Sequence, residues 1–181
     1  MLLMGRSPSA ISRSCSHCGD GAILTPSHGR FVGASSVPFS DYKRKQGDRL
    51  GLNWRIPNVR GKRAVRHVVY DTNYWKSFIH ARLAVAMGDP GCLSLFGEKP
   101  DQHRMFAEHI TAEYRVKTEG RGRTVDEWKM RPERADNHWL DGLVGCAVAA
   151  SIQGVVLFGT DGTSASRHQR IKLSDLQRSK R

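Results

Sequence analysis

Two aspartates occupy positions where a carboxylate could do chemistry. Asp141 lies within residues 137–151, where apolar residues recur at helical spacing around more than half of the circumference. On that helix Asp141 falls at the edge of the apolar stripe, within about 20° of Val148. A carboxylate there needs a partner, because an unpaired charge is costly to bury. The pattern leaves two partners open: one of the chain's many arginines, or a metal ion in a catalytic centre.

The second aspartate, Asp71, follows an apolar, β-branched run at residues 64–70 and precedes a helical pattern. Ligands of open α/β sheets gather beyond the carboxyl ends of the strands. Mg²⁺ is commonly held there by one or two carboxylates with several waters. The alternative is a structural aspartate at the start of a helix, favoured by the helix dipole, with Thr72 as the N-cap.

Basic residues cluster in a predicted β-hairpin at residues 114–130, whose turn contains Gly120 and Gly122. Such side chains suit contacts with the phosphates of a duplex, although a merely solvated basic face has the same pattern. The whole chain has 29 Lys and Arg against 17 Asp and Glu, a net charge of +12, which favours a polyanionic partner. The candidate nucleic-acid-binding residues are Arg115, Lys117, Arg121, Arg123, Lys129 and Arg131.

Two other kinds of site find little support. Cys15-Ser-His-Cys18 has the spacing of half a zinc site, but no second pair follows it, so a free pair of thiols is favoured. Four cysteines in 181 residues are also too few for a disulfide scaffold. The chain contains no G-x-x-x-x-G-K-[ST] loop, which excludes nucleotide hydrolysis by a P-loop mechanism in this sequence.

The elements that must position these residues alternate between strand and helix, which indicates a mixed α/β fold. Alternation predicts a strand over residues 50–56, and an apolar, β-branched run predicts another over 64–70. Helical spacing predicts helices over 72–87, 101–112 and 137–151, with the hairpin before the last of them. We expect an irregular segment at 1–45, one domain at 46–158 and a basic, disordered tail at 159–181.

A membrane span is not expected. Residues 142–159 carry no charge, but glycine, alanine, Ser151 and Gln153 make the stretch only weakly hydrophobic. The expected compartment is the cytoplasm.

Four segments follow one another in an order that resembles the C-terminal part of phage terminase large subunits of the GpA type: Val69–Lys76, Phe106–Arg115, Glu127–Pro132 and Asp136–Asp141. In that family a packaging ATPase precedes an RNase H-like, metal-dependent endonuclease domain. The resemblance implies an RNase H-like mixed sheet flanked by helices. It also implies cleavage of double-stranded, concatemeric DNA of a phage or prophage in the bacterial cytoplasm, with the terminase small subunit and the portal as partners.

By the same resemblance, Asp141 is a catalytic carboxylate and metal ligand, and Asp71 is a second one. Two Mg²⁺ or Mn²⁺ ions would activate the attacking water and stabilise the leaving oxygen. The family's opening strand, which carries its first acidic ligand in an Asp-Val-Gln-like context, has no match in residues 1–45. We therefore expect an N-terminally truncated fragment with an incomplete sheet. The alternative to a nuclease is a non-catalytic, basic remnant that binds double-stranded DNA.

Overall fold

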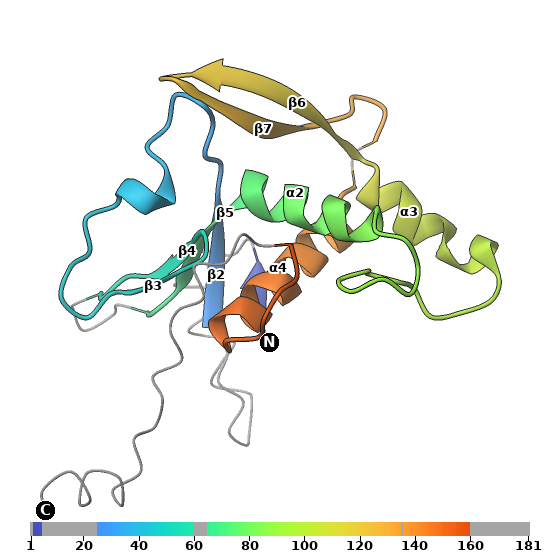
Figure 1. Ribbon diagram of the computed structural model, residues 1–181, viewed down its shortest axis with the longest axis horizontal. Coiled ribbons are helices and arrows are strands. Elements are labelled where there is room, and N and C mark those ends of the chain that lie inside the picture. The colour runs from blue at the N-terminus through green and yellow to red at the C-terminus, as the bar shows by residue number, and fades with distance from the viewer. Residues whose placement is uncertain (1, 5–24, 60–64, 135, 160–181) are drawn as a thin grey trace, which may run out of the picture.

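The computed structural model describes residues 2–4, 25–59, 65–134 and 136–159. Cys15, Cys18 and residues 160–181 lie outside this part, and so do the predictions made for them. The described elements form one five-stranded sheet, a separate two-stranded hairpin and helices packed beside them (Figure 1). This confirms the mixed α/β, RNase H-like class expected from the sequence, with a mixed sheet flanked by helices. No helix of the described part is long and apolar enough to cross a membrane.

The five-stranded sheet has the order β1-β2-β5-β4-β3. Strands β1 (Leu2–Met4), β2 (Thr25–Arg30) and β5 (Val68–Asp71) run parallel, with Ser27 opposite Val68 and Arg30 opposite Asp71. Strands β3 (Arg49–Gly51) and β4 (Trp54–Ile56) run antiparallel to each other, and β4 pairs antiparallel with β5. All four residues of β5 are buried, so this strand forms the centre of the sheet and ends at Asp71.

Two features of the sheet differ from the sequence prediction. The segment 1–45 was expected to be irregular, whereas it contains β2, in which Pro26 and Ser27 are buried. The single strand expected over residues 50–56 is two strands, β3 and β4, joined by a two-residue turn. Asn53 has a positive φ of 49° in that turn, a conformation that asparagine tolerates better than most residues.

The helices cover one face of the sheet. Helix α2 (Thr72–Leu83) follows β5 directly, and α4 (His138–Ile152) packs against α2. Between them come a 3₁₀ turn, η2 (Pro100–His103), and the short helix α3 (Arg104–Ile110). The principal core lies between the helices and this face and includes Trp54, Val68, Tyr70, Trp75, Ile79, Leu140, Val144 and Val148.

A smaller core covers the opposite face, where Val69 packs with Val32 and Phe39 from the loop after β2. That loop contains a second 3₁₀ turn, η1 (Phe39–Asp41). The alternation along β5 therefore places Val68 and Tyr70 against the helices and Val69 against the loop.

The hairpin of β6 (Glu113–Gly120) and β7 (Arg123–Met130) forms its own two-stranded sheet. It lies across α2 at one end of the molecule, beside the loop that follows β2 (Figure 1). The hairpin and the last helix occur where the sequence predicts them.

Candidate functional site

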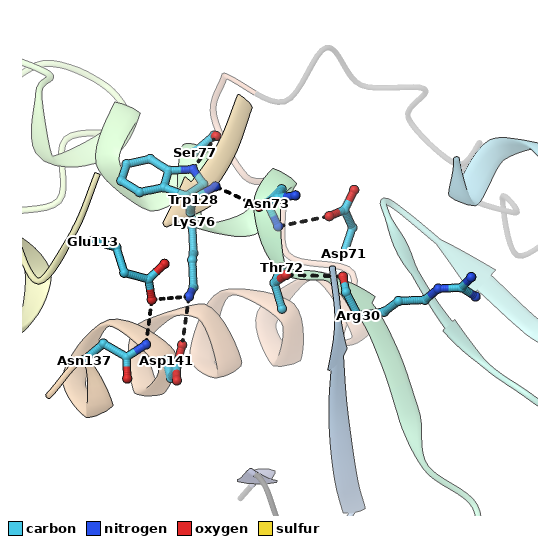
Figure 2. Close-up of polar contacts among 10 residues, drawn as sticks. All are labelled: Arg30, Asp71, Thr72, Asn73, Lys76, Ser77, Glu113, Trp128, Asn137 and Asp141. Carbon is cyan, nitrogen blue, oxygen red and sulfur yellow. Dashed lines mark hydrogen bonds and ion pairs between the residues drawn. The ribbon is translucent and has the colours of Figure 1, made fainter. Parts of the chain in front are cut away.

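A buried lysine joins three elements at the centre of the candidate site. The Nζ atom of Lys76, on α2, forms ion pairs with the Glu113 carboxylate at the start of β6 and with Asp141 Oδ1 in the first turn of α4, the latter at 3.4 Å. Asn137, directly before α4, donates its side-chain amide to Glu113 Oε1 at 2.6 Å. Figure 2 shows these four side chains converging between α2 and α4. We call Lys76, Glu113, Asn137 and Asp141 the Lys76 cluster.

The burial of the Lys76 cluster is uneven. The side chain of Lys76 is 11% exposed and that of Glu113 is 4% exposed, whereas that of Asp141 is 39% exposed. Because water hardly reaches the Glu113 carboxylate, its negative charge must be balanced by Lys76, and its hydrogen bonds must come from Lys76 and Asn137. Asp141 forms the outer edge of the cluster. Burial, together with the nearby Asp141 carboxylate, raises the pKa of Tyr70 to about 12, so its phenol is neutral at physiological pH.

Asp71 has a different environment. It is the N-cap of α2, and its carboxylate accepts hydrogen bonds from the backbone N–H groups of Asn73 at 3.0 Å and Tyr74 at 3.3 Å. The sequence had suggested Thr72 for this role, but the Thr72 hydroxyl donates instead to the Arg30 carbonyl at 3.2 Å. Burial raises the pKa of Asp71 to about 6, although its two backbone hydrogen bonds and the charge of Arg123 act in the opposite direction.

The six basic residues expected to contact DNA lie on the hairpin or directly after it, but they are not equivalent. Lys117, Arg121 and Lys129 are exposed. Arg115 is exposed but paired with Asp126 at 3.4 Å. Arg131 is exposed as well, and its Nε donates to the Thr111 carbonyl at 3.0 Å.

Arg123 also acts as a structural anchor. Its guanidinium donates to the carbonyls of Gly33 at 3.4 Å, Ala34 at 3.1 Å and Ser36 at 2.5 Å. These three bonds fasten the tip of the hairpin to the loop after β2. All three bonds come from one nitrogen of the guanidinium, Nη2, and a contact between Arg123 and a DNA phosphate stays a prediction.

A second set of contacts fastens the hairpin to α2. The side chain of Asn73, only 1% exposed, accepts from the Trp128 backbone N–H at 3.0 Å and donates to the Val32 carbonyl at 3.1 Å. The Trp128 indole donates to the Ser77 hydroxyl at 2.9 Å, and its ring stacks on His80 with 4.1 Å between centroids. Burial lowers the pKa of His80, which favours the neutral ring in this stack. The hairpin is therefore held by α2 at Trp128 and by the loop after β2 at its tip.

The family model for the terminase large subunit gpA endonuclease domain matches residues 54–160. The chain belongs to this family. The match spans Asp71, the Lys76 cluster and the whole hairpin, and it implies a nuclease role in phage DNA packaging. No curated protein and no solved structure matched the chain.

In this gpA endonuclease domain the two aspartates expected to share metal ions are not brought together. Asp141 is paired with Lys76, and Asp71 caps α2 with its carboxylate pointing away from the cluster (Figure 2). Among the described residues, the ion-pair partner of Asp141 is a lysine rather than one of the arginines that the sequence suggested. Within the described residues, no group of three or more His, Cys, Asp or Glu side chains could hold a metal ion.

Three members of the Lys76 cluster were not predicted as site residues of the gpA domain. The burial of Lys76 could have been predicted from the sequence, because Lys76 lies about 60° from Ile79 on a helical wheel and hence on the buried face of α2. Glu113 and Asn137 carried none, since each lies at the end of an element where sequence periodicity says little about burial. Lys76, Glu113 and Asn137 meet only because α2, β6 and α4 pack together in the folded domain.

Replacing Asp71 by asparagine should make the stability of the gpA domain less dependent on pH. Well below about pH 4 the Asp71 carboxyl is protonated in both the folded and the unfolded chain, so its burial costs no ionisation free energy. Between about pH 4 and pH 6 the unfolded chain ionises this carboxyl more readily than the folded chain does, and stability is lost until the folded group ionises as well. An asparagine side chain cannot ionise and caps a helix equally well. We expect the variant to gain on the order of 2 kcal/mol relative to the parent between pH 4 and pH 7.

Urea denaturation of both proteins across this pH range measures the difference. The exposed Asp89→Asn serves as the control and should show no such trend. A parent that gains stability relative to Asp71→Asn as the pH rises would show that Asp71 is stabilised in its charged form.

Proposed function

We propose that this domain grips double-stranded phage DNA through the backbone phosphates, using the exposed basic side chains of the β6–β7 hairpin, and cuts it during packaging. The observation that carries the proposal is the fixed hairpin, on which Lys117, Arg121 and Lys129 are exposed, with the exposed Arg131 directly after it. The net charge of +12 supports a polyanionic substrate, and membership of the gpA endonuclease family supports DNA. We further propose the terminase small subunit and the portal as partners in the host cytoplasm.

The endonuclease family implies divalent-cation chemistry, which we had expected from Mg²⁺ or Mn²⁺ at Asp141 and Asp71. Around Asp141 the structure offers Glu113 and Asn137, and carboxylate and amide oxygens are the ligands such ions prefer. The Lys76 ammonium, however, is bonded to both carboxylates. The described residues therefore do not fit a two-ion centre as they stand, and we assign no catalytic step to one.

The arrangement of Lys76 favours a second candidate function, binding of double-stranded DNA without cleavage. Lys76 forms ion pairs with both Asp141 and Glu113, and Asp71 accepts hydrogen bonds from the backbone of α2. Such a chain would hold duplex DNA through the same hairpin and leave cutting to another protein.

Incubation with supercoiled plasmid separates the two candidates. If the chain cuts, it should nick the plasmid in Mn²⁺ but not in EDTA; loss of nicking in Asp141→Asn, with DNA binding retained, would place Asp141 in the reaction. Retained cleavage in that variant would exclude Asp141 from the reaction. Binding without any nicking, in Mg²⁺ or Mn²⁺, would identify the non-catalytic candidate. Failure to bind duplex DNA at low salt would refute both.

The affinity for duplex DNA should fall steeply with salt, and the hairpin should account for part of that slope. Each neutralised phosphate contributes about −0.9 to the slope of log K against log salt. Arg121→Gln and Lys129→Gln should each make the slope shallower by about 0.9, and together by about 1.8. Arg123 is left unchanged because its loss would detach the hairpin tip.

Fluorescence anisotropy of labelled duplexes across salt concentrations measures these slopes. The matched control is Lys99→Gln, which removes one exposed positive charge outside the hairpin, directly before η2. An equal change in slope for the control and the hairpin variants would mean that net charge, rather than the hairpin surface, governs binding.

A further inference from the structure

The Lys76 cluster is arranged like a cation-binding site, but the cation in it is the ammonium group of Lys76. Two carboxylates, from β6 and α4, direct oxygens at one ammonium that arrives from α2. Asn137 satisfies Glu113 further, with its amide nitrogen toward the carboxylate (Figure 2). The cluster contains two negative charges and one positive charge, and its inner members are almost fully enclosed.

We infer that the Lys76 ammonium occupies the position between Glu113 and Asp141 that a divalent ion would need, and so prevents this carboxylate pair from binding one. An ion bonded to both carboxylates would lie where Nζ now lies, since Nζ is within ion-pair distance of each. Two cations cannot share that space, because their repulsion is strong where water is largely excluded.

Lys76 has no easy alternative position. The whole residue is only 9% exposed, its neighbour Trp75 is fully buried, and the exposed side of the cluster is occupied by Asp141. Moving the ammonium out would also leave Glu113, 4% exposed, with an uncompensated charge. Lys76 is thus the residue that decides whether Asp141 can serve a metal ion, and this role does not depend on whether the chain binds DNA.

Binding of Mn²⁺ alone, in the absence of DNA, tests the inference. The parent chain, Asp141→Asn, Lys76→Gln and the double variant Lys76→Gln/Asp141→Asn are titrated with Mn²⁺, and the free ion is measured by electron paramagnetic resonance. The parent and Asp141→Asn should bind Mn²⁺ equally weakly. Lys76→Gln should bind one ion at least about tenfold more tightly, and the double variant should lose that gain. Lys99→Gln is the matched control and should behave as the parent does.

A folded Lys76→Gln that binds Mn²⁺ no more tightly than the parent would overturn the inference. So would a parent whose Mn²⁺ binding disappears in Asp141→Asn, because the ion and Lys76 would then coexist. If circular dichroism shows that Lys76→Gln does not fold, the comparison of the parent with Asp141→Asn decides alone: equal affinity supports the inference and loss of binding refutes it. Because no DNA is present, the result is independent of the DNA-binding proposal.

Discussion

Replacing Lys76 by methionine should lower the free energy of unfolding by about 3–5 kcal/mol, the usual cost of removing one partner from a buried ion pair. Methionine fills most of the volume of the lysine stem, so the expected loss is mainly electrostatic. It arises at Glu113, whose side chain is 4% exposed and would keep, among the described residues, the Asn137 amide as its hydrogen-bond partner. Chemical denaturation at neutral pH measures the change.

Two further variants show that the effect belongs to the buried charge. Adding Glu113→Gln to Lys76→Met removes that charge while leaving an oxygen for Asn137, and we expect it to recover most of the loss. The control is Arg104→Gln, which breaks the exposed Arg104–Glu108 pair on α3 and should cost less than about 0.5 kcal/mol. If Lys76→Met costs no more than this control, water reaches Glu113 and the cluster is not a buried ion pair.

Replacing Asn73 by alanine should cost about 3 kcal/mol, because one side chain satisfies two backbone groups from other elements. Its loss leaves the Trp128 N–H and the Val32 carbonyl without these bonds at a position that is 1% exposed. Both the hairpin and the loop after β2 lose one of their connections to α2. Urea denaturation followed by tryptophan fluorescence measures the loss.

The matched control is Asn58→Ala. The Asn58 amide is exposed and donates to the Gln46 carbonyl at 3.0 Å, so its removal lets water take over and should cost less than about 1 kcal/mol. Similar costs for Asn58→Ala and Asn73→Ala would mean that solvent replaces the bonds of Asn73, and the hairpin would then be held mainly by Trp128 and Arg123.

The parts of the fold predicted from the sequence are those whose signal is local. The last helix and the hairpin have clear periods of 3.6 and 2 residues, and both occur where predicted. Strand β2 has the sequence Thr-Pro-Ser-His-Gly-Arg, which has no alternation, and it is a strand because β1 and β5 pair with it on both sides. Alternation also cannot reveal which face of a hairpin packs: Tyr114 is 39% exposed, while Trp128 and Glu113 face α2.

In the candidate site, too, the sequence predicted local properties but not tertiary contacts. The sequence correctly required a partner for Asp141, because its place on the helix is a local property. The identity of that partner, Lys76, depends on how α2 packs against α4. For Asp71 the helix-start alternative describes the observed contacts, which involve the next turn of its own chain. In the sequence Arg123 is one basic residue among six, and only the fold shows that it bonds three carbonyls of a distant loop.

The separation of the hairpin from the main sheet has a consequence for amide hydrogen exchange. In the described part of the chain, β6 and β7 pair only with each other, and a two-stranded sheet has little stability of its own. Its amides are therefore protected by contacts with the rest of the domain, among them those of Asn73, Trp128, Arg123 and Glu113. These contacts can break together while β5, buried along its whole length, stays closed. The basic edge of the domain should thus exchange as a cooperative unit of its own, at a lower opening free energy than the sheet.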